Sequence, residues 1–246
     1  MNRYHPYLRK SKSLNLKFKN KNNENDSLSE ESIDDTTPLD KLNPLGKLSK
    51  LGNFFNFNNN DDDVYLEENH LYFKADVDSH SINKLCTLIR KYSKQINDLQ
   101  THNKIAKVEP KPLYIHLSTY GGDLHQGFLG YDYIKGCKIP VYTVVEGFNA
   151  SAGTIMSMGG KKRFMTPSSV MLIHQLSTGY SGKFNELEED FENSKEDMER
   201  IRNLYLRECR GKMTKKQITE ELKHDRWWNA DKCIKKGLCD ELYTEF

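Results

Sequence analysis

The chain has 246 residues, which is enough for one α/β domain of ordinary size together with an extension. Its formal net charge of +2 points to no particular partner, and no apolar run approaches the roughly 20 residues of a membrane span. We therefore expect no nucleic-acid partner, no membrane partner and a cytoplasmic location. Because the first 23 residues are basic and contain no acidic side chain, import into a mitochondrion or another organelle is the alternative.

The cysteines favour a reducing compartment. Their number is odd and no two have CxxC spacing, so neither a disulfide framework nor a zinc ribbon is expected, and no metal site is predicted. The expected role is that of small, partly buried residues. The five are Cys86, Cys137, Cys209, Cys233 and Cys239.

Residues 1–63 form a low-complexity extension that we predict to be mostly disordered. Polar runs at 19–25, 56–60 and 61–63 cannot bury enough apolar surface to offset the entropy of an ordered chain. Scattered apolar residues leave a short docking helix as the alternative; they are Leu45, Leu48, Leu51, Phe54, Phe55 and Phe57. The second domain is predicted to cover residues 64–246.

The first predicted elements of that domain are a strand and a helix. Residues 71–73, followed by Ala75 and Val77, have the composition of a strand. Apolar side chains at helical spacing predict a helix over residues 81–96. The polar residues 97–111 are predicted to form an exposed loop.

Strands and helices then alternate along the chain. Strands are predicted at 113–117, 140–145 and 169–173, with helices around 129–134 and from 151 toward 158. This alternation favours an α/β fold built from right-handed βαβ units, whose active groups gather at the carboxyl ends of strands. Gly121, Ser151 and His174 all lie at such ends.

Residues 184–209 are predicted to form one long helix. Its apolar row follows heptad steps of three and four, and acidic side chains cluster near its start. The row consists of Phe184, Leu187, Phe191, Ser194, Met198, Ile201 and Tyr205. Such a row needs a partner surface, which is either the rest of the chain or another subunit.

A Ser-His-Asp set is the chemistry that the sequence suggests. Ser151 lies in a turn between a strand and a helix, where its small neighbours Ala150, Ala152 and Gly153 let the backbone turn tightly. His174 ends a strand and is the candidate general base.

Other residues compete for these roles. His116, one strand upstream, is the nearest rival base. The paired glycines Gly121 and Gly122 can turn N–H groups toward an oxyanion. Asp225 is the candidate that orients the base, while Asp240 near the chain end is expected to cap or pair. Asp190, Asp197 and Asp231 compete on composition alone.

From Val64 to Phe246 the chain resembles the ClpP family of caseinolytic serine proteases. Residues 147–153 resemble its nucleophile turn, and 160–167 with 171–175 resemble its path to the catalytic histidine. Residues 179–182 resemble the glycine-bearing strand before its long handle helix. The spacing near the end also matches, at Asp225, Arg226, Ala230, Gly237, Leu238 and Asp240.

The resemblance implies a ClpP/crotonase-like fold of repeated ββα units with a long handle helix. It makes Ser151 the nucleophile, His174 the base and Asp225 the orienting acid of a serine endopeptidase. The N–H groups of Gly121 and Ala152 would form the oxyanion hole, and Gly122 and Ser177 would contact substrate.

The resemblance also implies an assembly. A heptameric ring, or two such rings joined by the handle helices, would enclose the sites in a chamber that admits peptides and unfolded proteins. The chain lacks the GxxxxGK[ST] loop of ATP-binding proteins, so no cofactor is expected within it. ATP would act only through a separate AAA+ unfoldase.

The chain departs from the family pattern at several positions. Tyr120 stands where the family usually has Pro, Ala152 where it has Met, and Leu176 where it has Pro. At Tyr120 and Ala152 the chemistry needs only backbone atoms, so these two substitutions are compatible with activity. Residues 97–111 look inserted, and the N-terminal segment does not resemble the family's axial loop, which puts docking to an unfoldase in question.

Two other classes of function remain open at this point. A catalytically silent ring subunit or scaffold would share the fold without the activity. A crotonase-type acyl-CoA enzyme would share the general fold and an oxyanion hole but needs no serine nucleophile. A peptidase with a serine–lysine dyad is a lesser variant, against which the absence of an apolar anchor weighs.

Overall fold

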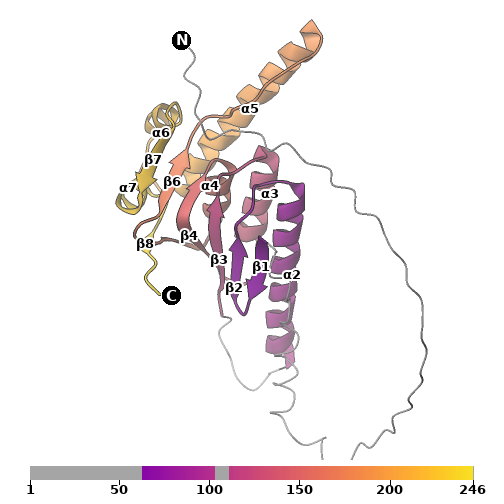
Figure 1. Cartoon of the computed structure of the whole chain (residues 1–246), viewed down its shortest axis with the longest axis vertical. Helices are drawn as coiled ribbons and strands as arrows, with labels where there is room; N and C mark the ends of the chain where they lie inside the picture. Colours follow the sequence, from indigo (N-terminus) through magenta and orange to yellow (C-terminus); the bar gives the residue numbers. More distant parts are fainter. Residues whose placement is uncertain (1–62, 103–110, 246) are drawn as a thin grey trace, which may run out of the picture. The chain divides into compact units, whose positions relative to one another are not determined.

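A computed structural model describes residues 63–102 and 111–245 (Figure 1). The chain divides into two units, 1–47 and 48–246, and every described residue lies in the second. The predicted extension over residues 1–63 lies, apart from Asp63, outside the described residues.

The described residues form an α/β fold, as the sequence predicted, and eight strands pair into one sheet. The strands are β1 (Val64–Glu67), β2 (His70–Phe73), β3 (Leu113–Thr119), β4 (Val141–Ala150), β5 (Lys162–Met165), β6 (Val170–Ile173), β7 (Arg226–Asn229) and β8 (Glu241–Leu242). The helices are α2 (Ser79–His102), α3 (Leu124–Lys135), α4 (Ala152–Ser157), α5 (Phe184–Glu208), α6 (Lys215–Glu221) and α7 (Ala230–Lys236).

Strand β4 organises the sheet because it has partners on both sides and changes one of them midway. The main path runs β1-β2-β3-β4-β5-β8, parallel except for the antiparallel first pair. The first half of β4 pairs with β5, whereas its last three residues pair with β6. Gly147, with φ of +64°, lies between the two halves. The antiparallel strand β7 then extends the sheet beyond β6.

One face of the sheet is covered by helices. Alternate residues of β3 (Leu113, Ile115 and Leu117) are fully buried in a core shared with residues of α2 such as Ile82 and Leu85. Because side chains alternate across a strand, this arrangement follows from the period-two pattern of β3 and the helical spacing of α2. Burial of each such side chain contributes roughly 1.5–3 kcal/mol.

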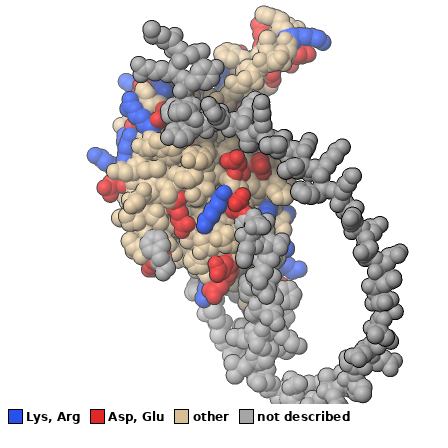
Figure 2. Space-filling model, in the orientation of Figure 1, with Lys and Arg blue, Asp and Glu red and all other residues tan. Residues whose placement is uncertain are grey.

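The opposite face carries a layer of aromatic rings. Tyr114 and His116 alternate with Leu113, Ile115 and Leu117 of β3, so they point away from the helices. Ring contacts continue from β1 to the C-terminal segment, for example Tyr114 to Tyr142 with centroids 5.4 Å apart. The layer comprises Tyr65, His70, Tyr72, Tyr114, His116, Tyr142, Phe164 and Tyr243. Much of the face seen in Figure 2 carries no charged side chain.

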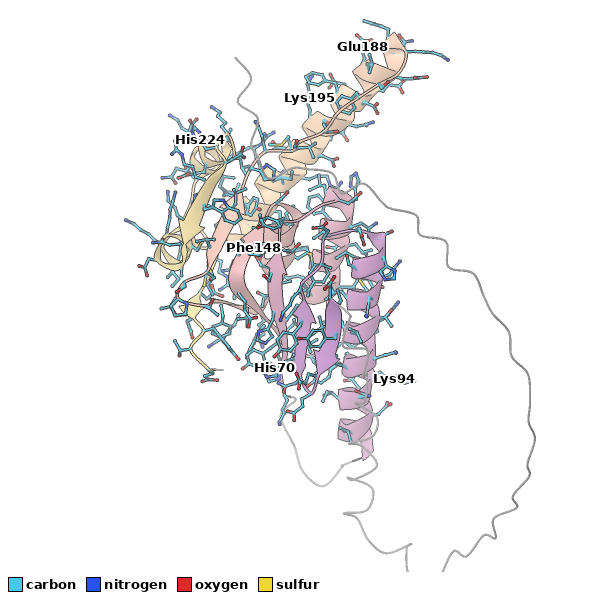
Figure 3. The ribbon with its side chains drawn as sticks, viewed as in Figure 1. His70, Lys94, Phe148, Glu188, Lys195 and His224 are labelled. Atoms are coloured by element: carbon cyan, nitrogen blue, oxygen red, sulfur yellow. The ribbon has the colours of Figure 1, made fainter. Side chains whose placement is uncertain are left out.

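Helix α5 divides into two halves with different surroundings. In its C-terminal half, Ile201 and Tyr205 of the predicted apolar row are buried in the second core cluster. In its N-terminal half, Phe184 and Phe191 remain 71% and 56% exposed. Figures 1 and 3 show this half, which includes Glu188 and Lys195, extending beyond the sheet. The row therefore packs within the chain at one end and is uncovered at the other.

Three local predictions are corrected. Residues 97–102, predicted as loop, continue helix α2; residues 103–110 lie outside the described part. Strands β1, β5 and β7 were not predicted, because each has only four residues and at least one of them is charged, which interrupts the apolar pattern. Residues 179–182 do not form the strand that the resemblance implied: they are exposed and have no strand partner within the described residues.

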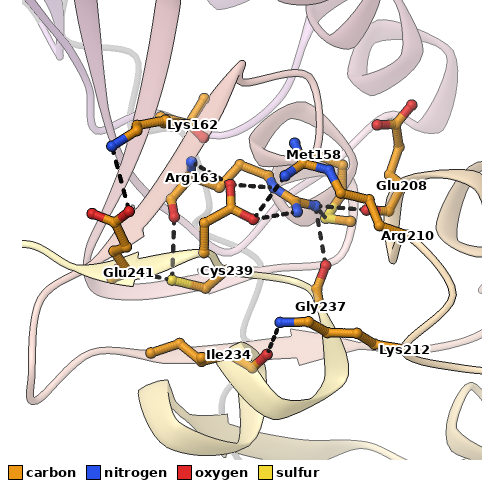
Figure 4. Close-up of polar contacts among 12 residues, drawn as sticks. Met158, Lys162, Arg163, Glu208, Arg210, Lys212, Ile234, Gly237, Cys239 and Glu241 are labelled. Atoms are coloured by element: carbon orange, nitrogen blue, oxygen red, sulfur yellow. Dashed lines mark hydrogen bonds and ion pairs between the residues drawn. The ribbon is translucent and has the colours of Figure 1, made fainter.

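The buried guanidinium of Arg163 joins β5 to the C-terminal part of the chain (Figure 4). It donates to both carboxylate oxygens of Asp240, at 2.6 and 3.2 Å. It also donates to the carbonyls of Glu208 at 2.9 Å and Gly237 at 3.0 Å. The guanidinium of Arg163 therefore holds together the end of α5, the end of α7 and the residue before β8. The expected pairing role of Asp240 is confirmed.

We predict that Asp240→Ala destabilises the protein by roughly 3 kcal/mol, because it leaves the buried charge of Arg163 without a counter-ion. Urea unfolding followed by circular dichroism measures the change. The matched control is the neighbouring Glu241→Gln, which breaks an exposed 3.4 Å ion pair with Lys162 and should cost less than about 0.5 kcal/mol. Equal effects of the two substitutions would contradict this account of Arg163.

Candidate active site

The three predicted strand-end residues lie at one edge of the sheet. Gly121 follows β3, Ser151 follows β4 and His174 follows β6. Strand β4 runs parallel to both β3 and β6, so the carboxyl ends of these strands point the same way. The sheet topology therefore brings together residues that are 30 and 23 positions apart in the sequence.

Ser151 occupies a strained turn between β4 and α4. Its φ of 55° and ψ of −126° lie in a region that L side chains rarely adopt. Its N–H donates to the Leu172 carbonyl of β6 at 2.9 Å, and its own carbonyl accepts from the Thr154 N–H at 3.0 Å. Both sides of the turn are therefore anchored, and α4 starts immediately afterwards at Ala152.

Gly121 packs directly against this turn. Its φ is +95°, and a Cβ at this position would lie 2.7 Å from the Ser151 Cβ and 2.9 Å from the Ala152 nitrogen. Gly122, with φ of +151°, approaches the Val77 carbonyl so closely that a Cβ there would lie 2.3 Å from its oxygen. Only glycine fits either position, which explains the paired glycines in the sequence.

The N–H groups around Ser151 differ from the sequence-based expectation. The Gly121 N–H donates to Thr119 Oγ1 at 3.0 Å, so in this conformation it is already engaged. Within the described residues, the N–H groups of Gly122 and Ala152 have no hydrogen-bond acceptor. Gly121 therefore contributes close packing, and Gly122 and Ala152 have the free donors. The signal that could have indicated this is Thr119, since a hydroxyl two residues before a glycine can accept its N–H.

Strand pairing also places Asp225 beside His174. In the antiparallel register of β6 and β7, Ile173 faces Arg226, so the residues that flank this pair are His174 and Asp225. His174 Nδ1 lies 3.7 Å from Asp225 Oδ1, an ion-pair separation that is longer than a hydrogen bond. The His174 side chain is 22% exposed, whereas that of Asp225 is 73% exposed.

Burial lowers the pKa of His174 below its usual value, and the nearby charge of Asp225 opposes this effect. Burial prevails because removing an imidazolium from water is costly, whereas the charge of an exposed carboxylate is screened by solvent. The lowered pKa of His174 favours the neutral imidazole at pH 7, which is the form that a general base needs.

The site is not fully connected in this conformation. Among the described residues, no hydrogen bond joins Ser151 Oγ to His174. Ser177, predicted to contact substrate, is exposed in the segment after β6, and Gly122 is exposed beside Gly121. Tyr120, which is 67% exposed, packs against the half-buried Phe148 with ring centroids 4.2 Å apart and ring planes tilted by 31° (Figure 3 labels Phe148).

His116, the rival base, has a structural environment. It is buried, and its Nδ1 lies 2.6 Å from Glu146 Oε1 while its Nε2 lies 2.8 Å from His70 Nδ1. The hydrogen bond from His116 lowers the pKa of Glu146. Both ring nitrogens are therefore occupied within the aromatic layer, and His116 is a satisfied residue of the sheet.

The described residues hold neither a cluster of metal ligands nor a membrane-spanning helix. Within 63–102 and 111–245, no three His, Cys, Asp or Glu side chains are grouped as metal ligands. No helix in that same part of the chain is both long and apolar enough to cross a membrane. All five cysteines are free thiols, and burial raises the pKa values of Cys86, Cys209 and Cys239 to about 11.

Comparison with known families agrees with this geometry. The family model described as Clp protease matches residues 66–246, which is most of the chain. The chain belongs to the Clp protease family.

Curated relatives carry the same family name. The ATP-dependent Clp protease proteolytic subunit 2 of Treponema denticola is 33% identical over 134 residues, which cover 54% of this chain and 66% of that protein. The proteolytic subunit of Streptococcus mutans is 32% identical over 144 residues, covering 56% and 71%. That of Corynebacterium efficiens (subunit 2) is 27% identical over 187 residues, covering 74% and 85%. The chain thus spans just under two thirds of the Treponema denticola relative.

A solved structure shows the same fold. A point mutant of ClpP1 from Listeria monocytogenes superposes with a TM-score of 0.54 at 23% identity, covering 70% of this chain and 89% of that one. The ClpP-like α/β fold predicted from the sequence is therefore confirmed for the described residues.

The pKa of His174 leads to a prediction that needs no catalytic assay. In NMR titrations the His174 ring should change protonation below pH 6.5, and in Asp225→Asn lower still, because the substitution removes the charge that raises its pKa. Asp132→Asn, an exposed site on α3, is the control and should leave the midpoint unchanged. A His174 midpoint above 6.5, or no response to Asp225→Asn, would contradict the described environment.

Proposed function

We propose that this protein is a serine endopeptidase that hydrolyses peptides or unfolded proteins. Ser151 is its nucleophile, His174 its general base and Asp225 the carboxylate that orients the base. The observation that carries the proposal is the anchored, left-handed turn at Ser151, packed against Gly121 at the sheet edge that also holds His174. A strained turn of this kind is unfavourable for serine and is typical of a functional site.

In the proposed reaction, Ser151 Oγ attacks the scissile carbonyl as His174 accepts its proton. The resulting oxyanion accepts hydrogen bonds from the free N–H groups of Ala152 and Gly122, the latter in place of Gly121. Collapse of this intermediate releases the amine, which takes the proton from His174. Water then repeats the sequence on the acyl-enzyme and restores Ser151.

The proposed substrates, peptides and unfolded proteins, follow from the proposed assembly, because a closed chamber would admit only such chains. Exposed apolar side chains on α5 support assembly, namely Phe184 and Phe191. We propose a heptameric ring, with a second ring joined through α5, so that the sites face a chamber. A separate AAA+ unfoldase would supply ATP-driven entry, and this chain would need no cofactor of its own.

A catalytically silent subunit is the second candidate, and the present geometry of the three residues favours it. Asp225 is largely exposed and lies 3.7 Å from His174, and Ser151 is not hydrogen-bonded to the histidine. Catalytic hydrogen bonds are often long in unliganded enzymes and shorten when substrate binds. The two candidates therefore make different predictions for a reagent that reacts only with an activated serine.

We expect a fluorophosphonate probe to label wild-type protein at one residue, Ser151, and Ser151→Ala to remain unlabelled. Intact mass and peptide mapping identify the adduct. The control is Ser181→Ala, an exposed serine outside the site, which should label like wild type. A folded wild-type oligomer that fails to react would favour the silent subunit.

Assembly through α5 is tested separately. Replacing both Phe184 and Phe191 with Ser removes the exposed apolar pair and should reduce the native mass, because the uncovered half of α5 would lose its contact surface. Asn185→Ser, between them and also exposed, is the control. Native mass spectrometry that finds the same assembly in all three proteins would rule out this role of α5.

A further inference from the structure

Two buried hydroxyl groups link helix α5 to the carbonyl of Ser151. Thr154 Oγ1, on α4, lies 2.6 Å from the Ser151 carbonyl oxygen and 2.5 Å from the hydroxyl oxygen of Tyr205. Tyr205 and Thr154 are both buried, at 2% and 0% exposure. The three groups thus form a chain of hydrogen bonds, and both of its hydroxyl groups are shielded from water.

The direction of this chain follows from the number of protons. The Ser151 carbonyl can only accept, so the single hydroxyl proton of Thr154 is donated to it. Thr154 Oγ1 is then the acceptor for the Tyr205 hydroxyl. Hydrogen bonds arranged in series polarise one another and are stronger in a water-free environment, so Tyr205 strengthens the bond that Thr154 makes to Ser151.

The carbonyl of Ser151 and the N–H of Ala152 belong to one peptide unit. That unit is planar and trans, so the two groups point in opposite directions. Anchoring the carbonyl on Thr154 therefore fixes the direction of the Ala152 N–H, which has no acceptor among the described residues. The same anchor opposes relaxation of the strained φ and ψ at Ser151.

We propose that Tyr205 and Thr154 are positioning residues that aim the Ala152 N–H at the oxyanion and hold the Ser151 turn. This inference rests on the proposed peptidase function. Neither residue touches substrate in this role; each acts through the Ser151–Ala152 peptide unit. The segment of α5 that holds Tyr205 is the packed half, so the long helix would contribute to catalysis as well as to assembly.

The test removes single hydroxyl groups. Tyr205→Phe and Thr154→Val each keep the shape of the side chain, and each should lower kcat for a fluorogenic peptide about 10-fold with KM nearly unchanged, because an oxyanion donor is misaligned. The double variant should be about as slow as either single variant, since both break one chain. Thr154→Ser retains the hydroxyl and should restore most of kcat.

The matched control is Tyr131→Phe. It also removes a buried hydroxyl that contacts α5, at Glu208 Oε1 (2.7 Å), but has no contact with the Ser151 turn. We expect its kcat to stay within about twofold of wild type. A folded Tyr205→Phe with wild-type kcat, additive losses in the double variant, or a Thr154→Ser as slow as Thr154→Val would each overturn the inference.

A structural readout separates this inference from the proposed function. If wild type has no Ser151-dependent activity, the proposed function fails, yet a crystal structure of Tyr205→Phe still tests the positioning role. A rotated Ser151–Ala152 peptide unit would support it. An unchanged Ser151 turn in that structure would overturn it.

Discussion

At Ser151 the chain passes from β4 into α4 with a φ of 55°, and the arrangement of the whole site depends on this turn being held. The Leu172 carbonyl anchors its N–H, Thr154 anchors its carbonyl, and Gly121 leaves no space between the turn and the β3 loop. A conformation that costs about 1–3 kcal/mol in an unconstrained chain persists only where its surroundings determine it. Here those surroundings are strand pairing on one side and buried hydroxyl groups on the other.

The C-terminal part of the chain is held in register by a different interaction. Arg163 satisfies its buried charge through Asp240 and two carbonyls, which fixes where α5 and α7 end relative to β5. Between these ends, β7 pairs with β6 and brings Asp225 beside His174. The aspartate is 104 residues from Gly121 in the sequence (225 − 121), and its place at the site is a result of these tertiary contacts.

The sequence predicted the α/β class, the strand-end placement of Ser151 and His174, and the pairing role of Asp240, because hydrophobic periodicity and turn residues are local signals. It did not predict the strands β1, β5 and β7, in which charged residues interrupt a pattern of only four positions. It also could not show that the Gly121 N–H is engaged by Thr119, or that Tyr205 reaches Thr154 from 51 residues away. Such contacts depend on how elements pack, which no local pattern contains.

The central claim is that the Ser151 turn aims the nucleophile and the Ala152 N–H at one point. A crystal structure of the fluorophosphonate adduct tests it most directly. The account predicts phosphorus bonded to Ser151 Oγ, with the phosphonyl oxygen about 2.7–3.1 Å from the nitrogens of Ala152 and Gly122. An adduct whose phosphonyl oxygen points away from both nitrogens, or an unmodified Ser151 in a folded protein, would contradict it.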